Sequence, residues 1–265
     1  MLIKNNDFNL THTFECGQCF RWNADENGVY TGVIYDKVVK IWQSEEGIFT
    51  DCDDTALLHD YFDLNRNYKA VKDKLSYDDI LKKAVAYGYG IRILKQQPWE
   101  TLISFIISAN NNIPRIKKII ESLCENFGDK IGEHYTLPTA DKLCGLAPSD
   151  LAVIRSGYRA DYIINAAQMV SCGTVDLDAV HNMPSAEGRS CLKQIKGVGD
   201  KVADCVLLFA YNKHDVFPKD VWIKRILNNL YAVQESEFDA FTKEKFGDLG
   251  GFAQQYLFYY QRSVS

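Results

Sequence analysis

The pattern of hydrophobic and polar positions changes its period near residue 53. Before that point, apolar and polar residues alternate over 29–35, 37–42 and 48–50, and turn-forming residues at 26–28 and 45–47 separate these segments. Alternation with a period of two is typical of a strand that buries one face. The N-terminal part of the chain therefore predicts a small antiparallel sheet.

After Asp53 the apolar residues recur at helical spacing. The run from Trp99 to Ser108 is apolar almost all round, as in a helix buried at the centre of a domain, and Pro98 suits its first turn. Apolar positions from Ile116 to Phe127 predict an amphipathic helix that ends at Gly128. Further helices are expected near 149–155, 159–170, 185–195, 200–211, 221–231, 237–245 and 250–262.

These segments predict an α+β fold. We expect a small N-terminal antiparallel β-sheet domain with flanking helices over residues 1–95. A larger all-helical domain is expected over residues 96–265. A chain of 265 residues is long enough to bury the core of one or two domains, and no repeat or long linker interrupts it.

Composition narrows the class of protein. Hydrophobic residues make up 46% of the chain and charged residues 25%, which is ordinary for a soluble globular protein. No apolar run approaches the ~18 residues of a membrane span, and the first residues lack a signal-peptide core. We therefore expect a cytoplasmic monomer with no membrane partner. The net charge of −5 excludes a general coat for nucleic acid, so any DNA-binding surface must be a local patch.

The eight cysteines do not form a recognisable ligand or disulfide set. Cys16 and Cys19 form a lone Cys-x-x-Cys, and the other six are scattered along the chain. Scattered cysteines without a secretion signal are usually reduced and buried. No disulfide, metal or other cofactor is predicted.

The most informative segment is 192–205, followed by 217–222. An apolar helical run leads into Gly197-Val198-Gly199, and a second helix begins there, so a helix-hairpin-helix is expected at about 185–211. Glycine lets backbone amides reach the surface, and a helix N-terminus adds unpaired N–H groups that can bind a phosphate. A plain connection between two helices is the alternative interpretation.

Lys201 and Asp220 are the candidate catalytic pair. Lys201 falls in the first helical turn, where the helix dipole disfavours a charged amine and so favours the nucleophilic form. A solvated lysine on an ordinary helix is the alternative. Asp220 follows Pro218 and suits the N-cap of a helix that begins near Val221, or its carboxylate faces a reacting sugar. Nothing local decides between these two roles.

This combination resembles the helix-hairpin-helix Gly/Pro/Asp superfamily of DNA glycosylases. Gly197, Gly199, Pro218 and Asp220 match its pattern, and Lys201 is typical of its bifunctional branch. With four further strings in the right order, the resemblance extends from about Phe14 to the C-terminus and narrows to the 8-oxoguanine DNA glycosylase/lyase family. These strings are Gly17–Trp22, Ala109–Arg115, Gly157–Ala160 and Phe252–Phe258. The iron-sulfur cluster of some relatives needs four C-terminal cysteines, and none follows Cys205.

The resemblance implies how the damaged base is read. An enzyme that excises a base must extrude it into a pocket that reads its edges and covers its faces. Cys205 and Phe258 are expected on the two faces of the base and Gln254 on its Watson-Crick edge. A backbone carbonyl in the Gly17 loop would accept the N7 hydrogen that 8-oxoguanine carries and guanine lacks. Without the resemblance, Cys205 and Phe258 are core residues and Gly17 is a turn.

The resemblance also implies contacts outside the base pocket. Asn110, Arg115 and Arg159 are expected to fill the gap and hold the orphaned cytosine, with Tyr158 as a wedge, because amide and guanidinium donors suit the acceptors of cytosine. A surface salt bridge is the alternative role for either arginine.

The DNA phosphates are assigned to Gly197, Gly199, Lys219 and Trp222. Two of these depart from the family pattern: Trp222 stands where a histidine often contacts phosphate, and Lys219 replaces an aliphatic residue. In this interpretation the charge of Lys219 replaces the phosphate contact of the missing histidine, or backbone amides bind the phosphate instead.

The function implied is that of a bacterial-type bifunctional enzyme acting on double-stranded DNA with 8-oxoguanine opposite cytosine. The Lys201 amine would displace the base and form a Schiff base that eliminates to nick the strand. Two alternatives are a glycosylase of the same superfamily for another damaged base and a DNA-binding module without chemistry.

Overall fold

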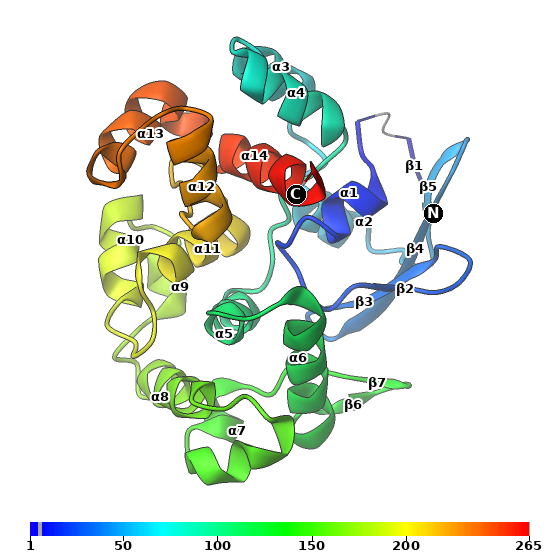
Figure 1. Cartoon of the computed structure of the whole chain (residues 1–265). Helices are drawn as coiled ribbons and strands as arrows, with labels where there is room; N and C mark the ends of the chain where they lie inside the picture. Colours follow the sequence, from blue (N-terminus) through cyan, green and yellow to red (C-terminus); the bar gives the residue numbers. More distant parts are fainter. Residues whose placement is uncertain (5–6, 265) are drawn as a thin grey trace.

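The computed structural model describes residues 1–4 and 7–264, and it consists of a sheet on one side of a larger array of helices (Figure 1). The strands are β1 (Leu2–Ile3), β2 (Asn23–Ala24), β3 (Tyr30–Ile34), β4 (Lys37–Ser44), β5 (Gly47–Thr50), β6 (Lys130–Ile131) and β7 (His134–Tyr135). The α-helices are α1 (Leu10–Phe14), α2 (Thr55–Tyr61), α3 (Tyr68–Leu75), α4 (Asp79–Tyr87), α5 (Pro98–Ser108), α6 (Ile113–Phe127), α7 (Ala140–Leu143), α8 (Arg159–Ser171), α9 (Leu177–Val180), α10 (Ser185–Leu192), α11 (Asp200–Tyr211), α12 (Val221–Asn229), α13 (Phe238–Phe246) and α14 (Gly250–Val264). Short 3-10 helices are η1 (Pro148–Ile154), η2 (Glu235–Glu237) and η3 (Gly247–Leu249).

The sheet is antiparallel and has the strand order β1-β5-β4-β3-β2. Thr31 of β3 pairs with Lys40 of β4, and Trp42 of β4 pairs with Phe49 of β5. One face of the sheet is buried with α1 and α2 in an aromatic cluster where Phe14 stacks on Trp22 at 4.3 Å between ring centroids. The alternation of apolar and polar residues in the sequence thus corresponds to the buried face of this sheet.

The helical core is built around α5, which lies near the centre of the view in Figure 1. Most of its side chains are buried, because α6, α8 and α11 contact it on different sides. Gln97 caps its N-terminus, and Pro98 occupies its first turn as the sequence predicts. A central helix with contacts all round places its C-terminal residue Ser108 next to α11, where the candidate nucleophile lies.

The α+β class, the sheet and the long helices are confirmed. The segment 149–155 is a 3-10 helix rather than an α-helix, and Pro148 begins it. Sequence analysis did not predict β1, α1, α3, α7 and α9 or the β6-β7 pair, and except for the eight-residue α3 these are too short to show a period. These elements form because tertiary contacts hold them, not because of local propensity.

The helices α3 and α4 pack with the helical core. Tyr68, Leu75 and Leu81 belong to the same buried cluster as α5 and α11, and α4 contacts α14. The domain division at residue 95 remains a prediction, since a continuous apolar core extends across it. Within the described residues, no helix combines the length and apolar character that crossing a membrane requires.

Candidate active site

The hairpin between α10 and α11 has the backbone that its glycines predict. Gly197 has φ of +86°, and a Cβ there would lie 2.3 Å from the Tyr162 ring, so only glycine fits. Gly199 is the N-cap of α11 and has no side chain to accept hydrogen bonds from the first turn. The first-turn amides are therefore left available to an external anion.

Lys201 projects from the first turn of α11 toward the end of α5. Its Nζ donates a 3.3 Å hydrogen bond to Ser108 Oγ, which in turn donates to the Phe105 carbonyl at 2.8 Å. The same Nζ lies 4.9 Å from the centre of the Phe105 ring. The Lys201 side chain is thus held by the Ser108 hydroxyl and the face of the Phe105 ring. Among the described residues it forms no ion pair with a carboxylate.

Two adjoining cavities meet at Lys201. The outer cavity measures about 380 Å³ and is lined by Lys201, Asp220, Trp222, Phe258 and Arg262 together with the start of α6. The inner cavity measures about 40 Å³ and adds Cys205, Gln254 and Gln255. Gly17, Phe105, Lys201, Asp220 and Phe258 line both. The amine therefore lies at the junction of a large outer cavity and a much smaller inner one.

Asp220 is the N-cap of α12, as its position after Pro218 predicts. Its carboxylate accepts a 2.9 Å hydrogen bond from the Ile223 amide. Burial raises the pKa of Asp220, while the amide hydrogen bonds and the Lys201 cation oppose this shift. The carboxylate also lines both cavities beside Lys201. The two roles that the sequence left open are therefore compatible in one side chain.

The inner cavity brings together the residues expected to read a base. Burial raises the pKa of the Cys205 thiol to about 12, although the neighbouring Lys201 lowers it, so the thiol is neutral at pH 7. Gln254 is only 6% exposed, and its Oε1 has no hydrogen-bond partner within the described structure. A buried amide oxygen without a partner costs stability, so a ligand that donates to it is favoured.

The loop at Gly17 closes the pocket against Phe258. Gly17 has φ of +80°, and a Cβ there would lie 3.0 Å from Phe258 Cε1. Gln18 holds the loop from inside: its Nε2 donates to the Arg92 carbonyl at 2.7 Å, and its Oε1 accepts from the Leu94 amide at 2.9 Å. Sequence analysis quoted Gln18 within a motif but gave it no role. Its complete burial is what identifies it as a support for this loop.

Three consecutive asparagines before α6 have different roles. Asn110 is exposed and adopts a left-handed conformation with φ of +50°, which asparagine tolerates. Asn111 donates to the Ile107 carbonyl at 3.1 Å, and Asn112 is the N-cap of α6. Arg115 is exposed one turn further on. Asn110 and Arg115 are thus both exposed, and their contact with the orphaned cytosine remains a prediction.

Tyr158 and Arg159 lie beside Asn110 but differ in exposure. The Tyr158 ring is 53% exposed, which suits a wedge. Arg159 is 4% exposed, and its guanidinium donates to the carbonyls of Ala109 at 3.0 Å and Asn110 at 2.9 Å. It also lies under the Tyr158 ring at 4.5 Å. In the free protein Arg159 therefore supports the asparagine loop and does not reach outward.

Lys219 and Trp222 have other neighbours in the free protein, and their contact with a DNA phosphate remains a prediction. The Lys219 ammonium pairs with Asp239 on α13 at 2.7 Å and also donates to the Phe217 carbonyl. This ion pair lies at the surface, since the Asp239 side chain is 89% exposed. Trp222 lines the outer cavity with an uncharged ring, on which the Arg225 guanidinium lies at 5.3 Å.

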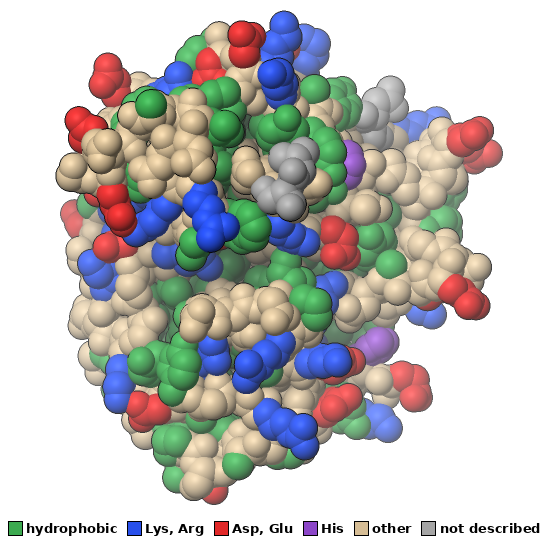
Figure 2. Space-filling model, in the orientation of Figure 1, with side chains coloured by type: hydrophobic (Ala, Val, Ile, Leu, Met, Phe, Trp, Pro, Cys, Tyr) green, Lys and Arg blue, Asp and Glu red, His purple; other side chains and the backbone are tan. Residues whose placement is uncertain are grey.

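Figure 2 shows how charged side chains are distributed on one face of the molecule. In Figure 2, lysine and arginine side chains flank an apolar hollow at the centre of this view, and acidic side chains gather mainly toward its edges. Such a distribution attracts a polyanion to the hollow although the whole molecule is acidic.

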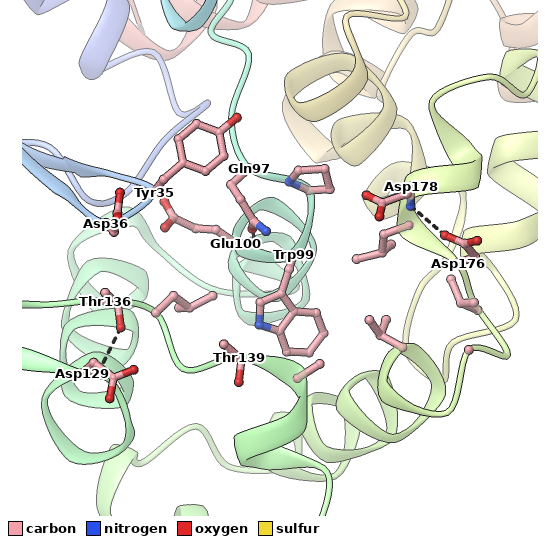
Figure 3. A pocket seen from close by; sticks show the side chains of 17 residues that line it. Tyr35, Asp36, Gln97, Trp99, Glu100, Asp129, Thr136, Thr139, Asp176 and Asp178 are labelled. Carbon is pink, nitrogen blue, oxygen red and sulfur yellow. Dashed lines mark hydrogen bonds between the residues drawn. The ribbon is translucent and has the colours of Figure 1, made fainter. Parts of the chain in front are cut away.

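A larger cavity of about 650 Å³ lies elsewhere, between the sheet and the loops around α7 and α9. Figure 3 shows Trp99 at its centre, with Asp36 and Asp129 to one side and Asp176 and Asp178 to the other. Among the residues that the structure describes, those that line it include neither a lysine nor an arginine. Size alone therefore does not identify the candidate site, because Lys201, Asp220 and Cys205 lie in the smaller pair of cavities.

The cysteines are all free thiols. Among the residues that the structure describes, no three His, Cys, Asp or Glu side chains are grouped so that they could hold a metal ion.

Two family models match the chain in succession. Residues 1–102 match the N-terminal domain of 8-oxoguanine DNA glycosylase, and residues 103–249 match the HhH-GPD superfamily of base excision DNA repair proteins. The second match covers more than half of the chain and includes the hairpin, Lys201 and Asp220.

Individual relatives agree with these models. The N-glycosylase/DNA lyase of Saccharomyces cerevisiae is 32% identical over 89% of this chain and 72% of its own length. A solved Clostridium acetobutylicum 8-oxoguanine glycosylase/lyase in complex with double-stranded DNA containing cytosine opposite 8-oxoG is 40% identical. It covers all of this chain and 98% of its own, with a TM-score of 0.93. The structure of MBOgg1 with a low affinity DNA ligand has the same TM-score, with 47% identity over 97% of this chain and 93% of its own. The chain therefore belongs to the HhH-GPD superfamily of base excision DNA repair proteins and, within it, to the N-glycosylase/DNA lyases.

Proposed function

We propose that this protein removes 8-oxoguanine paired with cytosine from double-stranded DNA and then nicks the strand at the abasic site. The observation that carries the proposal is the position of Lys201. Its amine lies at the junction of the outer and inner cavities, next to a buried carboxylate and a pocket with an unpartnered amide oxygen. A nucleophilic amine, a carboxylate that can act as a general base and a recognition pocket thus meet at the junction of the two cavities.

The inner cavity receives the extruded base. Gln254 Oε1 accepts a hydrogen bond from the Watson-Crick edge, while Cys205 and Phe258 cover the two faces. A carbonyl of the Gly17 loop accepts the N7 hydrogen of the lesion. The cavity is too small for a purine in the free protein, so Phe258 must shift away from Gly17 when the base enters. Binding is then an induced fit.

Lys201 performs the covalent step. Its neutral amine attacks C1′ of the sugar, the new C–N bond forms as the glycosidic bond breaks, and the base leaves with the bonding pair and takes up a proton. Opening of the sugar ring gives a Schiff base with a hydroxyl at C4′. Loss of a C2′ proton expels the 3′ phosphate, and water then releases the lysine.

Asp220 assists this step in two ways. Its carboxylate stabilises the positive charge that develops on the sugar. Because burial raises its pKa, it is also a stronger base than an exposed aspartate and accepts the proton that the lysine must lose. Ser108 holds the amine in place through its hydroxyl.

The other predicted groups act on the partner strand. Asn110 and Arg115 hold the orphaned cytosine, and the exposed Tyr158 ring enters the gap. Arg159 positions the asparagine loop from below and reaches the cytosine only if it leaves the Ala109 and Asn110 carbonyls. The amides at Gly197 and Gly199 bind a DNA phosphate.

The site is complete within one chain, which supports a monomer. The eight free thiols suit a reducing compartment and thus the cytoplasm. We propose no metal or other cofactor, because the amine itself is the nucleophile.

Incision of a panel of duplexes tests the function. Duplexes carry 8-oxoguanine opposite each of the four bases, an alkylated purine or an oxidised pyrimidine, and borohydride trapping runs in parallel. We expect preferred excision and trapping with 8-oxoguanine opposite cytosine, and loss of the trapped complex in Lys201→Gln with retained binding. A trapped adduct in Lys201→Gln, or preference for another lesion, contradicts the proposal. A protein that binds intact and damaged duplex alike and nicks neither would be a binding module.

A further inference from the structure

We propose that Arg262 supplies the phosphate-binding cation at the mouth of the pocket and contacts the backbone of the extruded nucleotide. This inference rests on the proposed function, since it concerns the same substrate. It assigns to the last turn of α14 a charge that sequence analysis placed on Lys219 at the other side of the site.

The need for such a cation follows from the residues around the mouth. Trp222, which lines the outer cavity, is uncharged, and Lys219 does not line this cavity and already pairs with Asp239 at 2.7 Å. Lys201 must act as a neutral amine and so cannot serve as a permanent charge in the reacting complex. Among the described residues that line the outer cavity, Arg262 is the remaining cation.

Arg262 is available for this role. Its Nη1 donates a 3.3 Å hydrogen bond to the Glu15 carbonyl, and no carboxylate within the described residues pairs with it. The Glu15 carboxylate itself lies 3.7 Å from Lys117. A single 3.3 Å hydrogen bond to a neutral carbonyl is weak. A phosphate, which offers two charged oxygens to the guanidinium, can therefore replace the Glu15 carbonyl as the partner of Arg262.

The position of Arg262 on α14 matches the path of the nucleotide. It follows Phe258 by four residues, so both side chains lie on one face of the helix about one turn apart. Phe258 lines both cavities, whereas Arg262 lines only the outer one. If Phe258 covers the base inside, Arg262 lies further out, where the sugar and its phosphate must pass. A guanidinium binds phosphate in a bidentate manner that an ammonium cannot reproduce.

The salt dependence of DNA binding tests the inference. Binding of a duplex with a non-cleavable tetrahydrofuran abasic site opposite cytosine is measured by fluorescence anisotropy over a range of KCl concentrations. Each lost phosphate contact lowers the slope of log affinity against log salt by about 0.9. We expect this loss for Arg262→Gln, together with about tenfold weaker binding at low salt. Arg262→Lys should keep the slope and lose part of the affinity.

Two further variants make the result specific. Lys69→Gln on α3 also removes one positive charge. Lys69 belongs to an exposed i,i+4 ion pair with Asp73 and does not line the outer cavity, so this variant should leave the slope unchanged. Lys219→Gln should also leave it unchanged. The inference is wrong if Arg262→Gln keeps the wild-type slope, or if Lys219→Gln and not Arg262→Gln lowers it. Either result leaves lesion excision and borohydride trapping by the wild type intact, so failure here is distinguishable from failure of the proposed function.

Discussion

The pair Asp220→Asn and Asp220→Ala separates the catalytic role of this residue from its structural one. The Asp220 carboxylate caps α12 through the Ile223 amide and also lines both cavities. Asparagine keeps an oxygen that can accept the same hydrogen bond but carries no charge, whereas alanine removes both. The two variants should therefore share a catalytic defect and differ in stability.

The magnitudes follow from the geometry. Loss of an N-cap oxygen costs about 1 kcal/mol, which we expect for Asp220→Ala and not for Asp220→Asn, because Asn and Asp are equally good caps. Burial raises the pKa of Asp220, so ionising this group opposes folding. The asparagine variant should therefore match or exceed the wild type in stability at neutral pH, and lose this advantage as the pH falls toward the unfolded value of about 3.9.

Catalysis should behave differently. Removing a charge that stabilises the transition state slows reactions by about 10²–10³. Single-turnover excision of 8-oxoguanine should fall by at least this factor in both variants. Urea unfolding at pH 7 and pH 4 measures stability on the same preparations. If Asp220→Asn excised the base at a rate near that of the wild type, or if it lost as much stability as Asp220→Ala, the reasoning would be refuted.

Three further predictions concern other residues. Burial lowers the pKa of His214 to about 3, so stability should fall by about 1.4 kcal/mol per pH unit below about 6.5; His214→Phe should flatten this slope in urea titrations, and an unchanged slope would assign it to another group. Gly17→Ala places a methyl group 3.0 Å from Phe258 Cε1 at a positive φ, so excision of 8-oxoguanine should drop while binding to an abasic duplex persists; wild-type excision kinetics would contradict this. Arg189→Met leaves Asp204, which is 2% exposed, without its 2.6 Å partner. The free energy of unfolding at pH 7 should then fall by about 3 kcal/mol. The loss should be smaller at acid pH, where Asp204 is protonated, and smaller in the control variant Arg189→Lys.

Local sequence was sufficient for most elements and for the hairpin. The period of the apolar positions located the sheet and the long helices, because a strand and a helix repeat their buried face every two and every 3.6 residues. Residue type also made an N-cap role possible for Asp220 and a turn at Gly197 expected, although it did not decide between the two roles of Asp220. These features depend on neighbours a few residues away, which the sequence displays directly.

Side-chain partners could not be read in the same way. Lys201 meets Ser108 across 93 residues, and Gly17 meets Phe258 across most of the chain. A long lysine or arginine side chain has many rotamers of similar energy, so the nearest opposite charge or carbonyl in the folded protein selects among them. Lys219 turns to Asp239 for this reason, and Arg159 turns inward to the Ala109 carbonyl. The types of chemical group at the site follow from local order along the chain, whereas their charge state, burial and direction depend on contacts between segments that only folding brings together.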